Sequence, residues 1–222
     1  MKKFITFEGG EGAGKTTLLN NLKNYLDEKQ IEYIAVREPG GTQECEKIRE
    51  FVLTSKDISP VSQFLLFSAS RSILVDKVIS PALNQNKLVL CDRYFDSSRV
   101  YQGFCSNIND EDILYITNFA TSGLIPEITF YLDIDPIVAF KRKQKIDEND
   151  VFETKNLEFH NKVREGFLRL ARKESNRFVV LDATKSQQEI LDNVVDILKK
   201  RGVIWWIYMN VYQKINMNMK IF

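Results

Sequence analysis

The sequence predicts an α/β fold in which a five-stranded parallel sheet carries helices on both faces. Two observations lead to this expectation. Short apolar runs typical of buried strands alternate five times with longer segments whose apolar side chains recur at helical spacing. The first apolar run, residues 4–8, passes directly into a glycine-rich segment and then into a helical pattern. Parallel strands joined by right-handed helical crossovers account for this order of elements.

The first half of the chain contains three of the expected strands, which are short and rich in Ile, Val, Leu and Phe, as in sheets buried on both faces. They cover residues 4–8, 31–36 and 88–91. The helices between them are expected from apolar side chains three and four positions apart. They cover residues 16–29, 44–53 and 61–84. Pro81 lacks an N–H group, so we expect it to end or kink the third helix.

The second half of the chain supplies the other two strands and the remaining helices. The strands cover residues 128–132 and 178–181, and the helices cover residues 110–121, 136–145, 156–173 and 187–200. Asp135 and Pro136 are suited to the cap and the first position of their helix. Gly202 ends the regular pattern, so we expect one domain from residue 1 to 202 and a tail of unknown role at residues 203–222.

The glycine-rich segment is typical of a phosphate-binding loop, and it predicts the fold of the P-loop NTPases. Gly9, Gly14, Lys15 and Thr16 match the pattern G-x-x-x-x-G-K-[ST] between a strand and a helix. Lys15 can reach the β- and γ-phosphates of a nucleoside triphosphate, and the Thr16 hydroxyl can bind Mg²⁺. The residues expected to bind the nucleotide are Gly9, Gly10, Glu11, Gly12, Ala13, Gly14, Lys15, Thr16 and Thr17.

Composition narrows the class of protein further. The chain has 222 residues, and its 31 basic and 30 acidic side chains leave a net charge of +1, which does not predict nucleic-acid binding. The three cysteines form no C-x-x-C pair, which suits free thiols in a reducing compartment. No apolar run is long enough for a signal peptide or a membrane span, so we expect a soluble, cytoplasmic protein.

Polar residues that follow the third strand predict a second site beside the triphosphate. Asp92 can hold Mg²⁺ directly or through water, and the Arg93 guanidinium can bind the phosphate of an acceptor. Residues 96–103 gather side chains that can hydrogen-bond a base and its sugar. Phe67 and Arg71 lie four positions apart on one helix face, where a base can stack on the ring. Taken alone, that pair also fits a core ring beside a solvated charge.

Several motifs, in this order, resemble those of the bacterial thymidylate kinases, and the likeness extends from Lys2 to about Gly202. They are Glu8–Thr17, Arg37-Glu38-Pro39-Gly40-Gly41-Thr42, Leu66-Phe67-x-Ala69-x-Arg71, Asp92-Arg93-Tyr94-x-Asp96-Ser97-Ser98, Tyr101-Gln102-Gly103 and Pro126–Asp133. The resemblance implies a nucleoside monophosphate kinase that transfers the γ-phosphoryl group of ATP to dTMP with the help of Mg²⁺, commonly as a homodimer. It also implies a cis peptide bond between Glu38 and Pro39.

The resemblance assigns roles to individual side chains. Phe67 would stack on thymine, Arg71 would bond a base carbonyl, and Tyr101 would crowd the 2′ position of the sugar. The residues assigned to dTMP are Arg37, Arg49, Phe67, Ser70, Arg71, Arg93, Ser98, Tyr101 and Gln102. The metal is assigned to Thr16 and Asp92, and catalysis is assigned to Glu11, Lys15, Asp92 and Arg93.

The chain departs from the family pattern in the expected lid, residues 141–155. Bacterial members usually have an arginine in an Asp-Arg-Phe-Glu-like stretch, where this chain has Val151. We therefore expect Arg142, with Lys143 or Lys145 as auxiliary, to supply the lid's contact with the transferring phosphoryl group. His160 is expected to be structural, because phosphoryl transfer does not require an imidazole.

Three alternatives compete with this interpretation. A GTP-binding switch protein needs an N-K-x-D motif, and neither Asn86-Lys87-Leu88-Val89 nor Asn161-Lys162-Val163-Arg164 supplies the aspartate. A noncatalytic ATP-binding module leaves Asp92 and Arg93 without a purpose. A sister kinase that acts on another nucleoside monophosphate is the nearest alternative, since it would use the same P-loop and the same chemistry.

Overall fold

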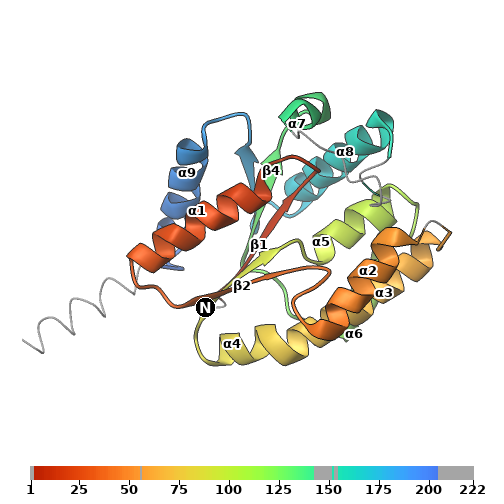
Figure 1. The fold of residues 1–222 in the computed structure, drawn as a ribbon, viewed down its shortest axis with the longest axis horizontal. Helices are drawn as coiled ribbons and strands as arrows, with labels where there is room; N and C mark the ends of the chain where they lie inside the picture. Colours follow the sequence, from red (N-terminus) through yellow and green to blue (C-terminus); the bar gives the residue numbers. More distant parts are fainter. Residues whose placement is uncertain (1–2, 56, 143–151, 153–154, 205–222) are drawn as a thin grey trace, which may run out of the picture.

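The computed structural model describes residues 3–55, 57–142, 152 and 155–204 of the chain (Figure 1). Its centre is a five-stranded sheet whose strand order is β2-β3-β1-β4-β5, with every neighbouring pair parallel. The strands are β1 (Phe4–Gly9), β2 (Tyr33–Arg37), β3 (Leu88–Asp92), β4 (Ile128–Asp133) and β5 (Phe178–Asp182). The predicted α/β fold with five parallel strands is confirmed.

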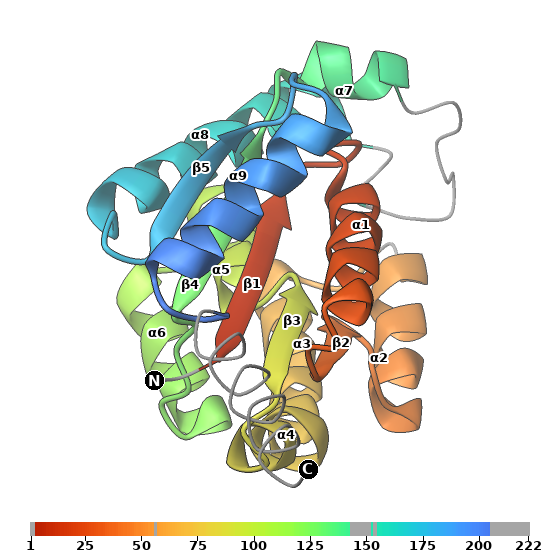
Figure 2. The ribbon, with the colours of Figure 1, turned by 90° about the vertical axis from the view of Figure 1, so that its left-hand side faces the viewer.

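Helices α1 (Lys15–Glu28) and α9 (Gln187–Lys200) lie side by side on one face of the sheet (Figure 2). Leu22 and Leu26 of α1 and Val194 of α9 pack on Ile5 and Phe7 of β1 in a single buried cluster. Because alternate side chains of a strand point to opposite faces, Phe4, Thr6 and Glu8 face the other layer of helices. Their burial shows that the sheet is covered on both faces, as its apolar strands predict.

The helices between β2 and β4 and the helix before β5 form the second layer (Figure 1). They are α2 (Gln43–Thr54), α3 (Pro60–Leu74), α4 (Ser80–Asn84), α5 (Phe95–Ser98), α6 (Asp110–Thr121) and α8 (Leu157–Lys173). Two buried clusters fix this layer, one around Leu74, Ile79 and Val89 and another around Tyr131, Phe167 and Phe178. The short helix α7 (Pro136–Arg142) follows β4.

The long helix predicted over residues 61–84 is interrupted before Pro81, as expected from this proline. The α-helical hydrogen bonding of α3 ends at Leu74, a π-helical turn covers Val75–Ile79, and α4 then carries Pro81 in its first turn. Proline has no N–H to donate to the preceding turn, and the wider π-helical turn lies directly before it. A second π-helical turn, Arg99–Phe104, follows α5 in a segment where the sequence pattern predicts no helix.

The structure describes two residues beyond Gly202, the expected end of the domain. Val203 and Ile204 are buried in the cluster under α1 and α9, so they belong to the domain core. The rest of the expected tail lies outside the described residues. Among the helices that the structure describes, none combines the length and the apolar character that a membrane span needs.

The register of the strands brings the predicted functional residues to one edge of the sheet. Asp92, the last residue of β3, pairs with Phe7 of β1 on one side and with Arg37 of β2 on the other. Gly9 ends β1 at this edge and opens the phosphate-binding loop. The carboxyl ends of parallel strands are where α/β folds bind their ligands.

Candidate active site

The loop between β1 and α1 is shaped to hold an anion. Gly12 and Gly14 have φ angles of 72° and 92°, in the left-handed region that glycine adopts without strain. A side chain at Gly12 would also place its Cβ 2.8 Å from the Ala139 carbonyl of α7. Helix α1 then begins at Lys15 with no side-chain cap and no acidic residue in its first turn. Its first N–H groups and its positive dipole end are therefore available to a phosphate.

Lys15 is folded back onto its own loop. Its Nζ donates hydrogen bonds to the carbonyl oxygens of Gly9 at 3.0 Å and Gly10 at 3.2 Å, and its side chain is buried. Burial lowers the pKa of this ammonium group from its ordinary value. Asp92, Glu11 and Glu8 favour the charged form. The lysine is thus held where a phosphate bound by the loop can receive its charge.

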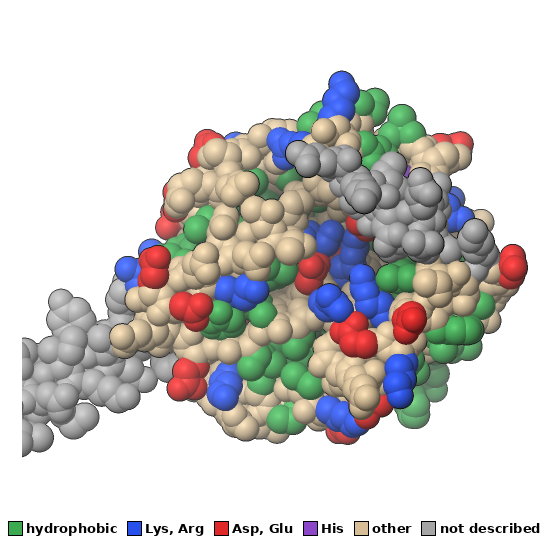
Figure 3. Space-filling model, viewed as in Figure 1, with side chains coloured by type: hydrophobic (Ala, Val, Ile, Leu, Met, Phe, Trp, Pro, Cys, Tyr) green, Lys and Arg blue, Asp and Glu red, His purple; other side chains and the backbone are tan. Residues whose placement is uncertain are grey.

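Two pockets meet at this loop. The first, the acceptor pocket, lies between β2, β3, α3 and the segment of α5 with its π-helical turn, and the second, the donor pocket, lies between the loop, α1 and the residues after β5. Glu11, Lys15 and Thr16 line both pockets. Lys and Arg side chains surround the hollow at the centre of the molecule (Figure 3). An anion in either pocket is therefore close to the same lysine.

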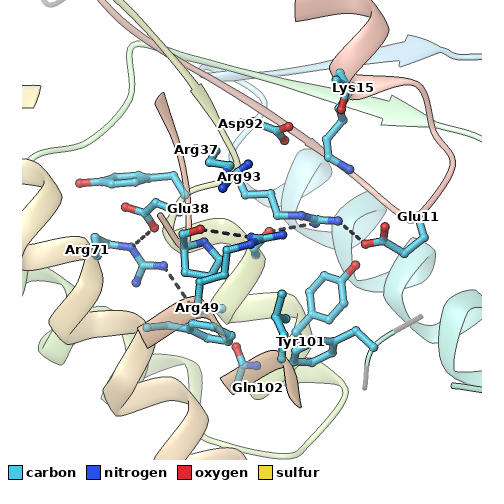
Figure 4. A pocket seen from close by; sticks show the side chains of 18 residues that line it. Glu11, Lys15, Arg37, Glu38, Arg49, Arg71, Asp92, Arg93, Tyr101 and Gln102 are labelled. Atoms are coloured by element: carbon cyan, nitrogen blue, oxygen red, sulfur yellow. Dashed lines mark hydrogen bonds and ion pairs between the residues drawn. The ribbon is translucent and has the colours of Figure 1, made fainter. Parts of the chain in front are cut away.

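At one end of the acceptor pocket, the Arg71 guanidinium is held by buried neighbours. Its Nε donates to Glu38 Oε2 at 2.7 Å and its Nη2 donates to Ser98 Oγ at 3.2 Å (Figure 4). The cation also lies over the ring of Tyr94, 5.4 Å from its centroid. Arg71 Nη1 and Glu38 Oε1 are buried and have no hydrogen-bond partner among the described residues. An unpaired donor on a fixed guanidinium is suited to a carbonyl oxygen of a ligand.

Aromatic rings form the walls next to Arg71. Phe67 of α3 lines the pocket, and Phe152 lies 6.4 Å from it between ring centroids. Phe152 also meets Tyr101 edge to face at 5.6 Å. Gln102, which is almost completely buried, lines the pocket beside these rings. Flat apolar walls with a few polar groups suit a nucleobase.

Arg93 occupies the end of the acceptor pocket that is nearest to the P-loop. Its backbone has a φ of 67°, which is uncommon for a residue other than glycine. Its Nη2 donates to Glu11 Oε1 at 2.6 Å, and its Nη1 donates to Ser97 Oγ at 3.3 Å. The guanidinium lies over the Tyr101 ring, 5.4 Å from the centroid. The cation therefore lies between the two pockets.

A buried carboxylate beneath the pocket fixes the turn that carries Arg93. Glu8 accepts hydrogen bonds from the backbone N–H of Tyr94 at 2.8 Å and from Ser97 Oγ at 2.7 Å. Its side chain has no exposure, and burial raises its pKa to about 7 against the pull of Arg93. Asp96 is also fully buried and accepts from both terminal nitrogens of Arg177, at 2.6 and 2.7 Å. Asp96 does not line the acceptor pocket, so its role is to hold the segment in place.

The remaining cations of the acceptor pocket come from β2 and α2. Arg37 lies at the end of β2 and its Nη2 donates to Glu46 Oε2 at 2.7 Å. Arg49 donates to the Pro39 carbonyl at 3.1 Å. The Glu38–Pro39 peptide bond is cis, so this prediction is confirmed. With Arg93, these guanidinium groups give the pocket a positive end and Phe67 marks its apolar end.

The residues expected to bind Mg²⁺ fit that ion. Asp92 Oδ1 is buried and has no hydrogen-bond partner among the described residues, so a ligand or ion is left to satisfy it. Thr16 lines both pockets and lies in the first turn of α1. No cluster of three or more His, Cys, Asp or Glu side chains in the described ranges could hold a metal. Mg²⁺ commonly takes one or two protein ligands, with water and substrate phosphates as the others, so two residues suffice.

Arg142 lies in the donor pocket. Its Nη1 donates to the Ala183 carbonyl at 2.6 Å and its Nη2 donates to the Thr184 carbonyl at 3.3 Å. These carbonyls belong to the loop after β5, and Lys185 of the same loop also lines the pocket. Arg142 does not line the acceptor pocket. Its guanidinium is therefore tied to the wall of the donor pocket.

Comparison with known proteins decides the family. A family model described as thymidylate kinase matches residues 7–194. The chain belongs to the thymidylate kinase family. The curated "Thymidylate kinase" of Thermoanaerobacter sp. (strain X514) is 41% identical over 199 residues, which are 89% of this chain and 98% of that protein. The "Thymidylate kinase" of Dehalococcoides mccartyi (strain ATCC BAA-2100 / JCM 16839 / KCTC 5957 / BAV1) is 43% identical over 196 residues, which are 87% of this chain and 94% of that protein.

A solved structure agrees with this membership. The crystal structure of thymidylate kinase from Ehrlichia chaffeensis is 32% identical, covers 88% of this chain and 97% of its own, and superposes with a TM-score of 0.72. The fold of the chain is thus that of the thymidylate kinases, and the resemblance found in its sequence motifs is confirmed. The chain is a nucleoside monophosphate kinase by family.

The structure brings most of the predicted site residues together. Those that line the acceptor pocket are Glu11, Lys15, Thr16, Arg37, Arg49, Phe67, Arg71, Asp92, Arg93, Ser98, Tyr101 and Gln102. The loop residues Gly12, Ala13, Gly14 and Thr17 line the donor pocket together with Arg142. Ser70 lines neither pocket, and its hydroxyl is buried without a hydrogen-bond partner among the described residues. Val151, Lys143 and Lys145 lie outside the described residues.

Some residues of the site carry no role in the sequence-based prediction. Glu38 belongs to a recognised motif, yet its pairing with Arg71 joins residues far apart in the chain. Phe152 lies in the expected lid beside Val151, and the sequence predicts no contact of its ring with the acceptor pocket. Ala183 and Lys185 follow the carboxyl end of β5, and that position alone marks them as candidates.

Proposed function

We propose that the protein transfers the γ-phosphoryl group of ATP to dTMP, giving dTDP and ADP. The observation that carries this proposal is that the two pockets share Glu11, Lys15 and Thr16. Phosphoryl transfer requires two anionic phosphates to be aligned, with cations that neutralise the charge between them. Lys15 and Arg93 lie at the junction where these phosphates would meet.

The acceptor pocket supports a pyrimidine monophosphate as the substrate. Phe67 offers a face on which a base can stack, and Arg71 Nη1 offers a hydrogen bond to a base carbonyl. At the opposite, positive end, Arg37, Arg49 and Arg93 can bind the 5′-phosphate. When that phosphate binds, the Arg93 guanidinium must either leave Glu11 or hydrogen-bond both Glu11 and the phosphate.

The donor pocket supports ATP. The loop and the first turn of α1 would hold its phosphates, and Arg142 and Lys185 would lie beside the rest of the nucleotide. Mg²⁺ would be held by the Thr16 hydroxyl and Asp92, and when bound it neutralises charge on the β- and γ-phosphates. The chain holds Lys15 and Arg93 in place before the reaction, so these cations need little movement to stabilise the negative charge that develops during phosphoryl transfer.

The test is an ADP-release assay that offers ATP and Mg²⁺ with dTMP, dUMP, dCMP, dGMP and dAMP in turn. We expect dTMP to give the highest kcat/KM, and we expect Lys15→Ala to abolish release with every acceptor. A preference for another monophosphate would identify the protein as a sister kinase. Release of ADP that does not depend on any acceptor would reject the proposal.

The proposal includes a homodimer in the cytoplasm. Exposed apolar side chains lie on α3 and on the two helices that pack against it, α2 and α6. They are Phe51, Val61, Leu65, Leu114, Tyr115 and Phe119. Tyr115 and Phe119 are 78% and 85% exposed and lie four positions apart, so they share one face of α6. A second copy of the chain would cover this surface. The free thiols of Cys45, Cys91 and Cys105 suit a reducing compartment.

A further inference from the structure

Glu38 and Arg71 form a buried ion pair. Their side chains are only 5% and 3% exposed, and Glu38 Oε2 accepts the Arg71 Nε–H at 2.7 Å. Glu38 is itself anchored, because its backbone N–H donates to the Asp92 carbonyl at 2.9 Å and its successor is Pro39. The backbone that carries the carboxylate is therefore held in place beside Arg71.

The bonds around Arg71 use two of its three nitrogens. Nε is bound by Glu38 and Nη2 by Ser98, and the Tyr94 ring lies against the plane of the guanidinium. Nη1 is left without a partner among the described residues, although it is buried in the wall of the acceptor pocket. A ligand with an acceptor atom opposite Nη1 would therefore satisfy a buried donor that otherwise has no hydrogen bond.

We propose that Glu38 is a positioning residue that sets base selectivity by locking Arg71, so that the kinase accepts a base with a carbonyl opposite Nη1 and rejects one with an amino group there. The inference rests on the proposed function, and it identifies dCMP as the acceptor that Glu38 excludes. Thymine and uracil carry an oxygen on C4, where cytosine carries an amino group.

The physical reason is that Arg71 Nη1 and the amino group of cytosine are both hydrogen-bond donors. If Arg71 is held in place, it cannot turn away from that amino group. With cytosine, the amino group and Arg71 Nη1 would face each other, and both would be desolvated without an acceptor. Sites built to hydrogen-bond a substrate group reject analogues that leave buried polar groups unpaired. A guanidinium that could swing aside would avoid this conflict, and the discrimination would fall. Ser98 provides only a neutral hydrogen bond of 3.2 Å, so the charged Glu38 is the stronger restraint.

The test measures kcat and KM for dTMP and for dCMP in the full chain and in Glu38→Gln, a change of nearly equal shape that removes the charge. We expect the KM for dTMP to rise about tenfold or more while the KM for ATP stays unchanged. The ratio of kcat/KM for dTMP to that for dCMP should fall about tenfold. Glu44→Gln is the matched control, because Glu44 pairs with Lys77 on the surface and lines neither pocket. It should change neither value.

A double-mutant comparison separates positioning from a merely structural role. If Glu38 acts through Arg71, then Glu38→Gln in an Arg71→Gln background leaves the dTMP to dCMP ratio where Arg71→Gln alone puts it. The double variant leaves neither residue as a buried unpaired charge, so it serves also if Glu38→Gln alone does not fold. A further fall of the ratio in the double variant would overturn the inference.

The outcomes distinguish this inference from the proposed function. A wild-type protein that does not phosphorylate dTMP rejects both. A wild-type protein that prefers dTMP over dCMP, with a Glu38→Gln variant that keeps the full preference and an unchanged KM for dTMP, supports the proposed function and overturns the role of Glu38.

Discussion

The carboxylate of Glu8 and the backbone N–H of Tyr94 are joined by a buried hydrogen bond of 2.8 Å. This bond connects the end of β1 to the turn after β3, and the turn places Arg93 at a φ of 67°. The second oxygen of Glu8 accepts from Ser97, which in turn accepts from Arg93. A carboxylate that lines neither pocket thus sets the position of a cation beside the P-loop.

Glu8 should make the protein less stable as the pH rises. Burial raises its pKa from 4.5 to about 7, so between these values the folded protein holds a proton that the unfolded chain has lost. The free energy of unfolding should therefore fall from about pH 5 to about pH 8, by up to about 3 kcal/mol for Glu8. Urea unfolding of the ligand-free protein across this range measures the change.

A variant separates Glu8 from the other acids. Glu8→Gln should remove the part of the pH dependence that Glu8 supplies, since an amide cannot titrate. Glu44→Gln is the control, because a hydrogen bond from Lys77 lowers the pKa of that exposed acid to about 2 and it does not titrate above pH 5. If Glu8→Gln keeps the wild-type slope, Glu8 is charged throughout this range.

Phe67 should contribute to acceptor binding and not to ATP binding. Its ring lines the acceptor pocket and is absent from the donor pocket. Phe67→Ala removes a stacking surface worth about 1 to 3 kcal/mol for a base. Steady-state kinetics should show a higher KM for dTMP, with a KM for ATP close to that of the wild type. An unchanged KM for dTMP would remove Phe67 from the base site.

The sequence alone identifies features, such as the phosphate-binding loop, that are determined by a short run of consecutive residues. The loop that ends in Lys15 and Thr16 is recognisable because backbone geometry and glycine spacing determine it. The roles of Glu8 and Glu38 are not, because each depends on a partner brought close only by the sheet and the helix layer, at positions 86 and 33 residues away. Ser70, which the resemblance assigns to dTMP, lines neither pocket, because a position one residue from Arg71 on a helix points in another direction.

The exposed face of α6 should control assembly. Phe119 is 85% exposed, which leaves a large ring in water unless a partner covers it. Phe119→Glu places a charge on the surface formed by α2, α3 and α6, and burial of that unpaired charge would oppose a dimer. Sedimentation should find a dimer for the wild type and a monomer for the variant. Lys199→Glu, on the distant helix α9, should leave the dimer intact, and a monomeric wild type would contradict the prediction.

Arg142 should act on ATP binding more than on the chemical step. The sequence favours Arg142 as the lid cation that contacts the transferring phosphoryl group, which predicts that Arg142→Ala lowers kcat at least about tenfold with little change in either KM. The structure instead ties both terminal nitrogens of Arg142 to the carbonyls of Ala183 and Thr184 in the wall of the donor pocket. A cation in that position would contact the donor nucleotide and not the acceptor.

The geometry therefore favours a different outcome for the same variant. Arg142→Ala should raise the KM for ATP about tenfold, as expected for loss of one charged contact, and leave the KM for dTMP unchanged. Arg169→Ala is the control, because Arg169 pairs with Glu165 on the surface and lines neither of these pockets. If kcat falls while the KM for ATP is unchanged, Arg142 leaves the loop after β5 during turnover and serves the phosphoryl group.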